Sequence, residues 1–300
     1  MPDIELVEVG PRDGLQNEAV PFSTAQKLEF IDRAVAAGAR RIEAGSFVNP
    51  KLVPQMADAE AIAAALPRRE GLIFIGLVLN KRGALRAIEA GMEELGAVCA
   101  ASDGFALRNQ GTSADDSLAM CCEVVRLAAG HGRRAQITIS TAFGCPFDGE
   151  VDPQRVVSMA RTAAAAGPRE VALADTIGVA TPGEVTRLVT AVAAAIAPTP
   201  VRVHFHNTRN TGLANVWAAV QAGAKAVDAS LGGIGGCPFA PRATGNVPTE
   251  DVVYLLERSG VRTGLDLERL IDAARWLGAV MGREVPGLLS RAGAFPPAPR

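Results

Sequence analysis

The sequence predicts an α/β protein, a (β/α)8 TIM barrel with extra C-terminal helices, formed as a single domain over residues 1–300. Short apolar runs rich in Val and Ile alternate with longer Ala-rich segments of helical period, which is typical of parallel strands covered by helices. Eight such strands can be counted, and most of them end in polar residues. A doubly wound open sheet would give similar local signals, but these two observations favour a closed barrel.

The expected strands are short and spread along the chain up to about residue 231. They are Ile4–Val9, Arg41–Phe47, Leu72–Val78, Leu95–Ala100, Ala135–Ala142, Glu170–Ala174, Val201–His206 and Ala226–Leu231. Parallel barrel strands are buried on both faces, so near-continuous apolar runs of this kind are what the fold requires.

The segments between the strands carry helix signals. Thr181, followed by Pro182 and Glu184, is a helix start, and Gly38 and Gly167 stand where helices should end. Expected helices include Ser23–Ala37, Pro54–Leu66, Asp115–Ala129, Pro153–Ala166, Pro182–Ala195 and Thr211–Ala222. Residues 232–285 should form a loop and accessory helices, and the last residues a frayed tail.

Composition excludes several classes of protein. Lys and Arg number 30 against 32 for Asp and Glu, and no basic cluster predicts a nucleic-acid partner. No apolar run approaches the roughly 20 residues of a membrane span, so no membrane partner is expected. The five cysteines form neither a disulfide framework nor a CxxC pattern, and the first strand begins too near Met1 for a signal peptide. We therefore expect a cytoplasmic protein.

Polar side chains gather where the expected strands end. Glu43 and Ser46 lie in the second strand, Ser140 and Thr141 in the fifth, and Asp175 directly follows the sixth. Barrel enzymes build their sites at the carboxyl ends of their strands, so this end is the candidate site.

The seventh strand ends in an HxH pair, His204 and His206, which are two of the three histidines in the chain. Alternation along a strand places both imidazoles on one face, where they are either metal ligands or hydrogen-bonded core residues. Asp13, after the first strand, supplies a carboxylate that can reach the same barrel mouth. This donor set favours Mg²⁺ or Mn²⁺, although Zn²⁺, Co²⁺ and Fe²⁺ would also fit.

Arg12 stands beside Asp13, and a buried guanidinium is costly unless it is paired. It either forms an internal ion pair with Glu43 or Asp175 or stabilises a developing oxyanion. The residues alone leave both interpretations open.

The glycine-rich segment Leu231–Ala240 is predicted to be a mobile loop over the site, without the spacing of a nucleotide-binding motif. Its thiol, Cys237, is either a catalytic acid or an adventitious small residue. Asn246, further along, is either a neutral oxygen ligand or the polar end of this loop.

Four motifs together resemble the 3-hydroxy-3-methylglutaryl-CoA lyase family: Val7–Glu18, Ser46–Lys51, Asp175–Gly178 and Gly235–Ala240. The resemblance extends from Val7 to about Thr263. It implies four ligands for the divalent metal: Asp13, His204, His206 and Asn246. The implied catalytic residues are Arg12, Glu43, Asp175, His204 and Cys237.

The implied reaction is a retro-Claisen cleavage of an acyl-CoA thioester that releases acetoacetate and acetyl-CoA. His204 or Asp175 would take the substrate's hydroxyl proton, Arg12 would hold the enolate oxygen, and Cys237 or a metal-bound water would protonate the carbon. The expected substrate-binding residues are Gln16, Ser46, Ser140, Thr141, Asn207 and Arg209. We also expect a homo-oligomer, either a dimer or a tetramer.

The chain departs from the family pattern at Asn207, where the family usually has Asp, at Arg209, and in the segment Arg108–Thr112. These changes allow a related substrate such as citramalyl-CoA or a longer 3-alkyl homologue. Two alternatives are a Claisen-condensing synthase or pyruvate aldolase on the same scaffold, and a silent acyl-CoA-binding barrel. The Gly-Gly-Cys-Pro loop favours a lyase over a synthase or aldolase. The presence of Arg12, Asp13, both ligand histidines and Cys237 disfavours a silent barrel.

Overall fold

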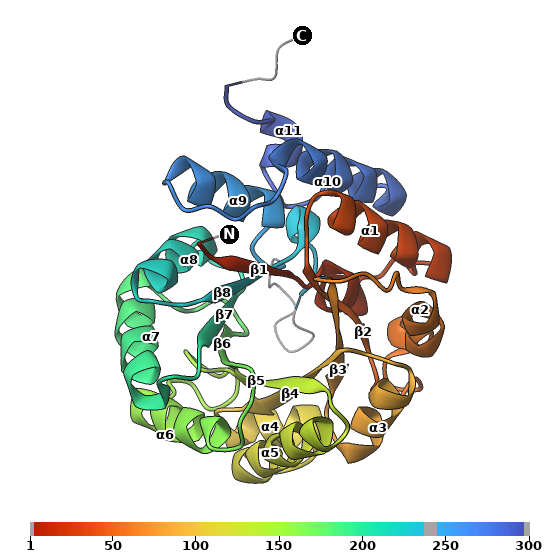
Figure 1. Ribbon diagram of the computed structural model, residues 1–300. Helices are drawn as coiled ribbons and strands as arrows, with labels where there is room; N and C mark the ends of the chain where they lie inside the picture. Colours follow the sequence, from red (N-terminus) through yellow and green to blue (C-terminus); the bar gives the residue numbers. More distant parts are fainter. Residues whose placement is uncertain (1–2, 237–244, 297–300) are drawn as a thin grey trace.

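The computed structural model describes residues 3–236 and 245–296. Its strands close into a parallel barrel in the order β1 to β8, which confirms the predicted fold (Figure 1). The strands are β1 (Glu5–Glu8), β2 (Arg41–Ser46), β3 (Ile73–Val78), β4 (Glu94–Ala100), β5 (Arg134–Ser140), β6 (Val171–Asp175), β7 (Val201–Phe205) and β8 (Ala226–Ala229). β1 pairs with both β2 and β8, so the sheet has no free edge.

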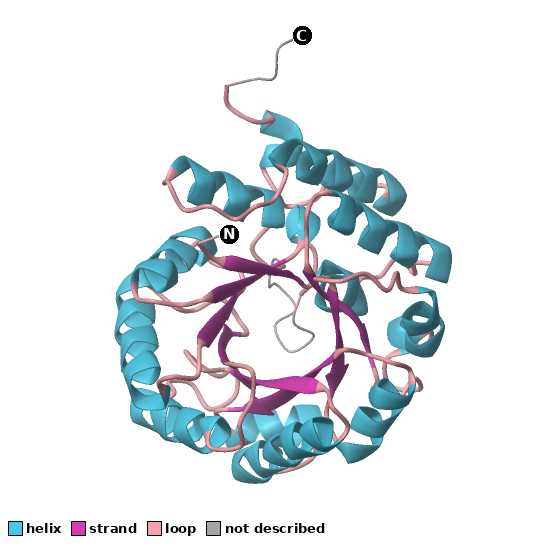
Figure 2. Ribbon diagram, in the orientation of Figure 1, coloured by secondary structure: helices cyan, strands magenta, loops and turns pink. Residues whose placement is uncertain are grey.

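Helices surround the strands on the outside of the barrel (Figure 2). They are α1 (Thr24–Ala36), α2 (Ala59–Ala65), α3 (Lys81–Glu89), α4 (Asp103–Gln110), α5 (Ala114–Gly130), α6 (Pro153–Ala164), α7 (Pro182–Ile196), α8 (Gly212–Gln221), α9 (Thr249–Arg258), α10 (Leu267–Met281) and α11 (Leu289–Ala292). Three short turns complete the list: the π-helix η1 (Gly10–Gly14) and the 3-10 helices η2 (Pro54–Met56) and η3 (Leu231–Gly233). Within the described residues, no helix is both long enough and apolar enough to cross a membrane.

The helix expected over Pro54–Leu66 is divided into η2 and α2. Asp58 stands before α2, but its side chain does not cap that helix. Instead its carboxylate accepts hydrogen bonds from Thr24 at 2.7 Å and Lys27 at 2.6 Å. These long-range contacts occupy the carboxylate of Asp58, so it does not form the local N-cap of α2.

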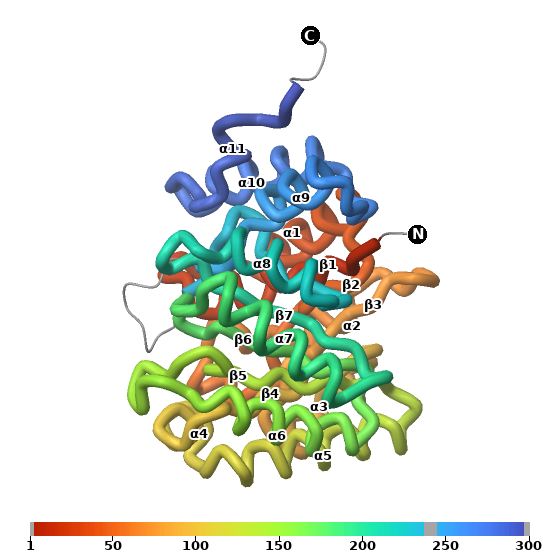
Figure 3. Tube along the Cα trace, turned by 90° about the vertical axis from the view of Figure 1, so that its left-hand side faces the viewer, coloured from red at the N-terminus to blue at the C-terminus, as the bar shows by residue number. Residues whose placement is uncertain are grey.

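The C-terminal helices α9, α10 and α11 lie together outside the ring, next to α1 and α8 (Figures 1 and 3). Two buried carboxylates join them to the segment after β8. Glu250 accepts from the amide of Gly232 at 3.0 Å, and Glu8 accepts from Leu231 at 2.9 Å and Thr249 at 2.7 Å. Burial raises the pKa of Glu8 to about 7 and that of Glu250 to about 8. The helices therefore brace a turn at the rim of the barrel.

The inside of the barrel is more polar than the space between strands and helices. Outside the strands the core is apolar, with Phe30, Phe74 and Phe205 fully buried. At the amino ends of the strands, by contrast, Arg41 is 0% exposed and forms ion pairs with several carboxylates: Glu5 at 3.0 Å, Glu170 at 2.6 Å and Glu94. This charged layer closes the end of the barrel opposite to the candidate site.

Candidate active site

The chain turns sharply after β1 and directs Arg12 and Asp13 into the barrel mouth. In η1, the carbonyl of Val9 accepts from the amides of Arg12 at 3.2 Å and Asp13 at 2.7 Å. A Cβ on Gly10 would lie 2.6 Å from a Glu8 oxygen and 2.7 Å from the Phe30 ring, so only glycine fits at the first position of this turn. The tight turn is what brings two consecutive charged side chains to one point.

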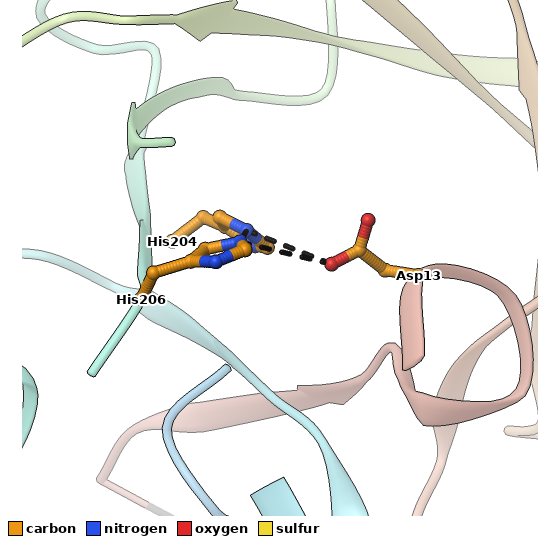
Figure 4. Close-up of side chains that lie close together, drawn as sticks. All are labelled: Asp13, His204 and His206. Carbon is orange, nitrogen blue, oxygen red and sulfur yellow. Dashed lines mark hydrogen bonds and ion pairs between the residues drawn. The ribbon is translucent and has the colours of Figure 1, made fainter. Parts of the chain in front are cut away.

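The two histidines of β7 meet Asp13 across the mouth of the barrel. The Nε2 atoms of His204 and His206 are 3.1 Å apart, and each is 3.9 Å from Asp13 Oδ2. Both imidazoles extend from one strand toward the carboxylate, which faces them from the opposite side (Figure 4). The predicted convergence of the first and seventh strands is therefore present in the structure.

This donor set fits a divalent cation. One atom from each of Asp13, His204 and His206 lies within 4.8 Å of the others. The side chains are 16%, 12% and 5% exposed, so the cluster is mostly buried. Two imidazole nitrogens and a carboxylate oxygen, with room for further oxygen ligands, suit a metal that acts on a substrate rather than a closed structural site.

Two further side chains hold this cluster from behind. His204 Nδ1 is 3.1 Å from Asp228 Oδ2, and Asn246 donates from Nδ2 to Asp13 Oδ2 at 2.8 Å and to the carbonyl of Ile234 at 3.2 Å. Asn246 therefore contacts the carboxylate of Asp13 through its amide nitrogen. Its service as an oxygen ligand through Oδ1 stays a prediction.

Arg12 bridges Asp13 of this cluster and Glu43. Its guanidinium lies 2.7 Å from Asp13 Oδ1 and 2.6 Å from Glu43 Oε2, and its Nε donates to the same Glu43 oxygen at 2.7 Å. The ion pair with Glu43 that the sequence allowed is thus formed. It does not exclude the oxyanion role, because Arg12 also lines the site cavity.

The ionisation of the cluster follows from burial and the neighbouring charges. Burial opposes the charge on Asp13, but Arg12 and the two histidines outweigh it and hold the pKa of this carboxyl below its ordinary range. Burial and the charge of His204 lower the pKa of His206 to about 4. Burial acts to lower the pKa of His204 too, but the hydrogen bond to Asp228 reverses the direction and raises it. Asp13 and His206 are therefore in the ionised and unprotonated states that a metal requires, whereas His204 gives up a proton when a metal binds.

A cavity of about 610 Å³ opens directly onto these residues. Arg12, Asp13, Glu43, His204 and His206 line it, and so do Gln16 and Ser140 among the expected substrate-binding residues. Apolar side chains line the part formed by β3, β4 and α4, including Leu79, Val98 and Phe105. The volume is within the range of small-molecule sites.

Other expected site residues are not among the described residues that line this cavity: Ser46, Thr141, Asp175, Asn207 and Arg209. Both oxygens of Asp175 accept backbone amides, from Val179 and Ala180, each at 2.9 Å. Asn207 accepts from the amide of Gly212 at 2.9 Å, while Arg209 donates to the carbonyls of Ile177 and Gly178. These contacts shape the loops at the rim.

Cys237 lies outside the described residues. The neighbouring Gly236 is described, and its carbonyl accepts from Asn17 Nδ2 at 2.7 Å. Gly236 also lines the cavity, so the glycine-rich segment reaches the candidate site at this residue.

Three residues at the floor of the cavity, Thr138, Arg202 and Asp228, were not expected from the sequence. Asp228 is paired in register with His204 on the neighbouring strand. Matching the two strands as parallel neighbours would have found it, because residues in register present their side chains to the same side of a sheet. Arg202 stands two residues before His204 on β7, so the alternation of side chains along a strand predicts that both point to the same side of the sheet.

Known proteins similar to this chain include acyl-CoA lyases. A relative from Chloroflexus aurantiacus, described as (R)-citramalyl-CoA lyase, is 45% identical, with 99% of this chain and 97% of the relative covered. A Pseudomonas aeruginosa relative, described as 3-hydroxy-3-isohexenylglutaryl-CoA/hydroxy-methylglutaryl-CoA lyase, is 44% identical, with 93% of each covered. The structure of an HMG-CoA lyase from Acinetobacter baumannii, in complex with coenzyme A and 3-methylmalate, matches with a TM-score of 0.93 and 42% identity over 98% of this chain and 96% of that one.

The family model described as HMGL-like matches residues 3–277, which include all eight strands of the barrel, α9 and most of α10. The chain therefore belongs to the HMGL-like family.

Proposed function

We propose that this chain is a metal-dependent carbon–carbon lyase that cleaves 3-hydroxy-3-methylglutaryl-CoA to acetoacetate and acetyl-CoA. The observation that carries the proposal is the convergence of Asp13, His204 and His206, with Arg12 beside them, on one cavity. Relatives at 37–44% identity that are described as hydroxymethylglutaryl-CoA lyases support the choice of substrate. Mg²⁺ or Mn²⁺ is the metal that we propose.

The reaction makes two electrostatic demands on the protein. The tertiary hydroxyl must lose its proton, and negative charge must be stabilised on the thioester oxygen when the bond between the second and third acyl carbons breaks. A divalent cation at Asp13, His204 and His206 would supply Lewis-acid chemistry that lowers the pKa of the hydroxyl. The guanidinium of Arg12 is preorganised by its two carboxylate partners, so it can stabilise the enolate oxygen without reorientation.

The proton acceptor that best fits the contacts is Glu43. Among the described residues, both nitrogens of His204 have partners, and both oxygens of Asp175 accept backbone amides. Both contacts of Glu43 with Arg12 use Oε2, which leaves Oε1 to take a proton. Burial raises the pKa of Glu43 even though Arg12 opposes this shift, and a raised pKa makes a carboxylate a better base.

The enolate carbon must then receive a proton to become the methyl group of acetyl-CoA. We assign this step to the thiol of Cys237. The support is the likeness of Gly235–Ala240 to the family motif and the position of Gly236 at the cavity.

A second candidate substrate is (R)-citramalyl-CoA, favoured by the relative of that name at 45% identity. It carries the same hydroxyl, methyl and thioester groups but has one methylene fewer before its carboxylate, and its cleavage would release pyruvate and acetyl-CoA. With either substrate, Glu43 would accept the hydroxyl proton and Arg12 would stabilise the enolate oxygen. They differ only in how far the carboxylate stands from the hydroxyl.

The test is a panel of hydroxyacyl-CoA thioesters incubated with the purified chain and Mg²⁺ or Mn²⁺, with products identified by mass. We expect acetyl-CoA and acetoacetate from 3-hydroxy-3-methylglutaryl-CoA. Turnover of citramalyl-CoA alone would replace the substrate but keep the lyase. Free thiol released from acetyl-CoA and a 2-keto acid would instead identify a synthase, and acyl-CoA binding without turnover would identify a silent barrel.

Two finer points complete the proposal. We propose that the protein works in the cytoplasm; the free thiols of Cys99, Cys121, Cys122 and Cys145 are consistent with a reducing compartment. We also propose a homo-oligomer, a dimer or tetramer, which sedimentation can test directly.

A further inference from the structure

We infer that Asp228 is a positioning residue, which fixes His204 with its proton on Nδ1 and so keeps the Nε2 lone pair directed at Asp13 and His206. The inference deepens the proposed function, since it concerns how the chain prepares one metal ligand. It can still be tested without any substrate.

The register of the barrel places Asp228 at His204. The two residues are paired neighbours on β8 and β7, and Asp228 Oδ2 lies 3.1 Å from His204 Nδ1. Asp228 is 5% exposed. An ionised carboxylate can only accept a hydrogen bond, so the proton of a neutral His204 ring must be on Nδ1. The opposite nitrogen, Nε2, is then free of hydrogen, as metal ligation requires.

Asp228 is kept ionised by a buried cation. Arg202, two residues before His204 on β7, has its Nε 3.4 Å from Asp228 Oδ1, and it is only 3% exposed. Arg202 is itself held by Thr138, which accepts from Nη2 at 3.3 Å, and by Glu170 at 3.4 Å. A chain of side-chain contacts therefore joins the charged layer at the base of the barrel to the candidate metal site. It runs from Glu170 to Arg202, Asp228 and His204.

The contacts of Asp228 separate this role from a purely structural one. Within the described residues, the only hydrogen bond of its side chain is the one to His204, while Oδ1 is buried without a hydrogen-bond partner. A carboxylate that served the fold alone would be expected to satisfy both oxygens. His206 gives the contrast inside the same site: its Nδ1 is buried and has no partner in the described structure. The two imidazoles are therefore prepared differently, and only His204 has its tautomer set by a carboxylate.

The experiment reads the tautomers directly. The chain has three histidines, so long-range ¹H–¹⁵N correlation spectra of the metal-free protein resolve every ring, and they are recorded at alkaline pH, above the raised pKa of His204, so that this ring is neutral. We expect His204 as the Nδ1–H form in the wild type. In Asp228→Asn, whose amide can donate to Nδ1, we expect a shift toward the Nε2–H form, with His131 unchanged as the internal reference. Mn²⁺ titrated into the metal-free variant should bind roughly 10- to 100-fold more weakly.

Glu170→Gln is the control for loss of a buried carboxylate, because Glu170 contacts Arg202 and Arg41 but not His204. It should leave the His204 tautomer and the Mn²⁺ affinity unchanged. An Nε2–H form of His204 in the wild type would overturn the inference, even if the Asn variant does not fold. Equal loss of Mn²⁺ affinity in both variants, or none in Asp228→Asn, would overturn it as well. Failure to cleave any thioester, with these spectra as expected, would refute the proposed function and leave the role of Asp228 standing.

Discussion

Replacement of Arg12 by Gln is the perturbation whose cost the structure defines most closely. The guanidinium contacts Asp13 at 2.7 Å and Glu43 at 2.6 Å, and the three side chains are 12%, 16% and 6% exposed. Gln leaves two nearly buried carboxylates without their shared cation. Breaking a buried pair in this way costs about 3–5 kcal/mol, and the partial exposure of Arg12 and Asp13 places the expected loss near the lower end. Loss of the enolate contact should also lower kcat by roughly 10²- to 10³-fold.

Urea unfolding at pH 7 and turnover of 3-hydroxy-3-methylglutaryl-CoA measure the two losses separately. Arg291→Gln is the matched control, since its partner Glu284 lies at 3.1 Å and the pair is 56% and 76% exposed. Such a surface pair contributes about 0–1 kcal/mol, so the control should remain close to the wild type in both assays. An Arg12→Gln protein that unfolds like the control and keeps kcat within about 10-fold would refute the bridging role of this guanidinium.

Three other predictions address the metal, the thiol and the buried acid. His206→Ala should abolish Mn²⁺ binding in calorimetry while keeping the circular dichroism spectrum, because the ring lies at the barrel mouth; an unfolded variant would make it a core residue instead. Cys237→Ser should lower kcat more than it raises KM, and unchanged kcat would remove this thiol from the mechanism. The pKa of Glu250 is raised to about 8, so the folded state holds its proton more tightly than the unfolded chain. Its contribution to stability is complete below about pH 4.5 and is lost as pH rises toward 8, by at most about 1.4 kcal/mol per pH unit. Glu250→Gln should therefore stabilise the protein at pH 8.5 but hardly at pH 5; equal effects at both pH values would contradict the raised pKa.

The fold could be predicted because its signals are local and repeated. Each strand is a short apolar run, and capping residues such as Ser23 and Thr181 mark helix starts that the structure confirms. The break before α2 could not be predicted, since Asp58 is diverted by Lys27, which is distant in the sequence. The charged barrel interior was also not anticipated. Arg41 and Arg202 stand in strands that read as apolar, and only closure of the barrel brings their partners within reach.

The proximity of Asp13, His204 and His206 could be predicted because the spacing of the two histidines fixes their common face, and because Asp13 follows the first strand. The residues behind them depend on register between strands, which no local pattern reports, and Asp228 was missed for that reason. Asp175 stands at a strand end, and its two oxygens accept amides of the following loop, a contact that the sequence did not indicate; its catalytic role stays a prediction. Position at the carboxyl end of a strand therefore does not by itself decide the role of a residue in the site.

The central claim is that one divalent cation binds between β1 and β7. Anomalous diffraction from crystals of the protein soaked in Mn²⁺ tests it directly. We expect one strong peak at about 2 Å from Asp13 Oδ2 and from the Nε2 atoms of His204 and His206. A peak elsewhere with none between these three side chains, or imidazoles that hydrogen-bond to each other in the presence of excess metal, would contradict the claim.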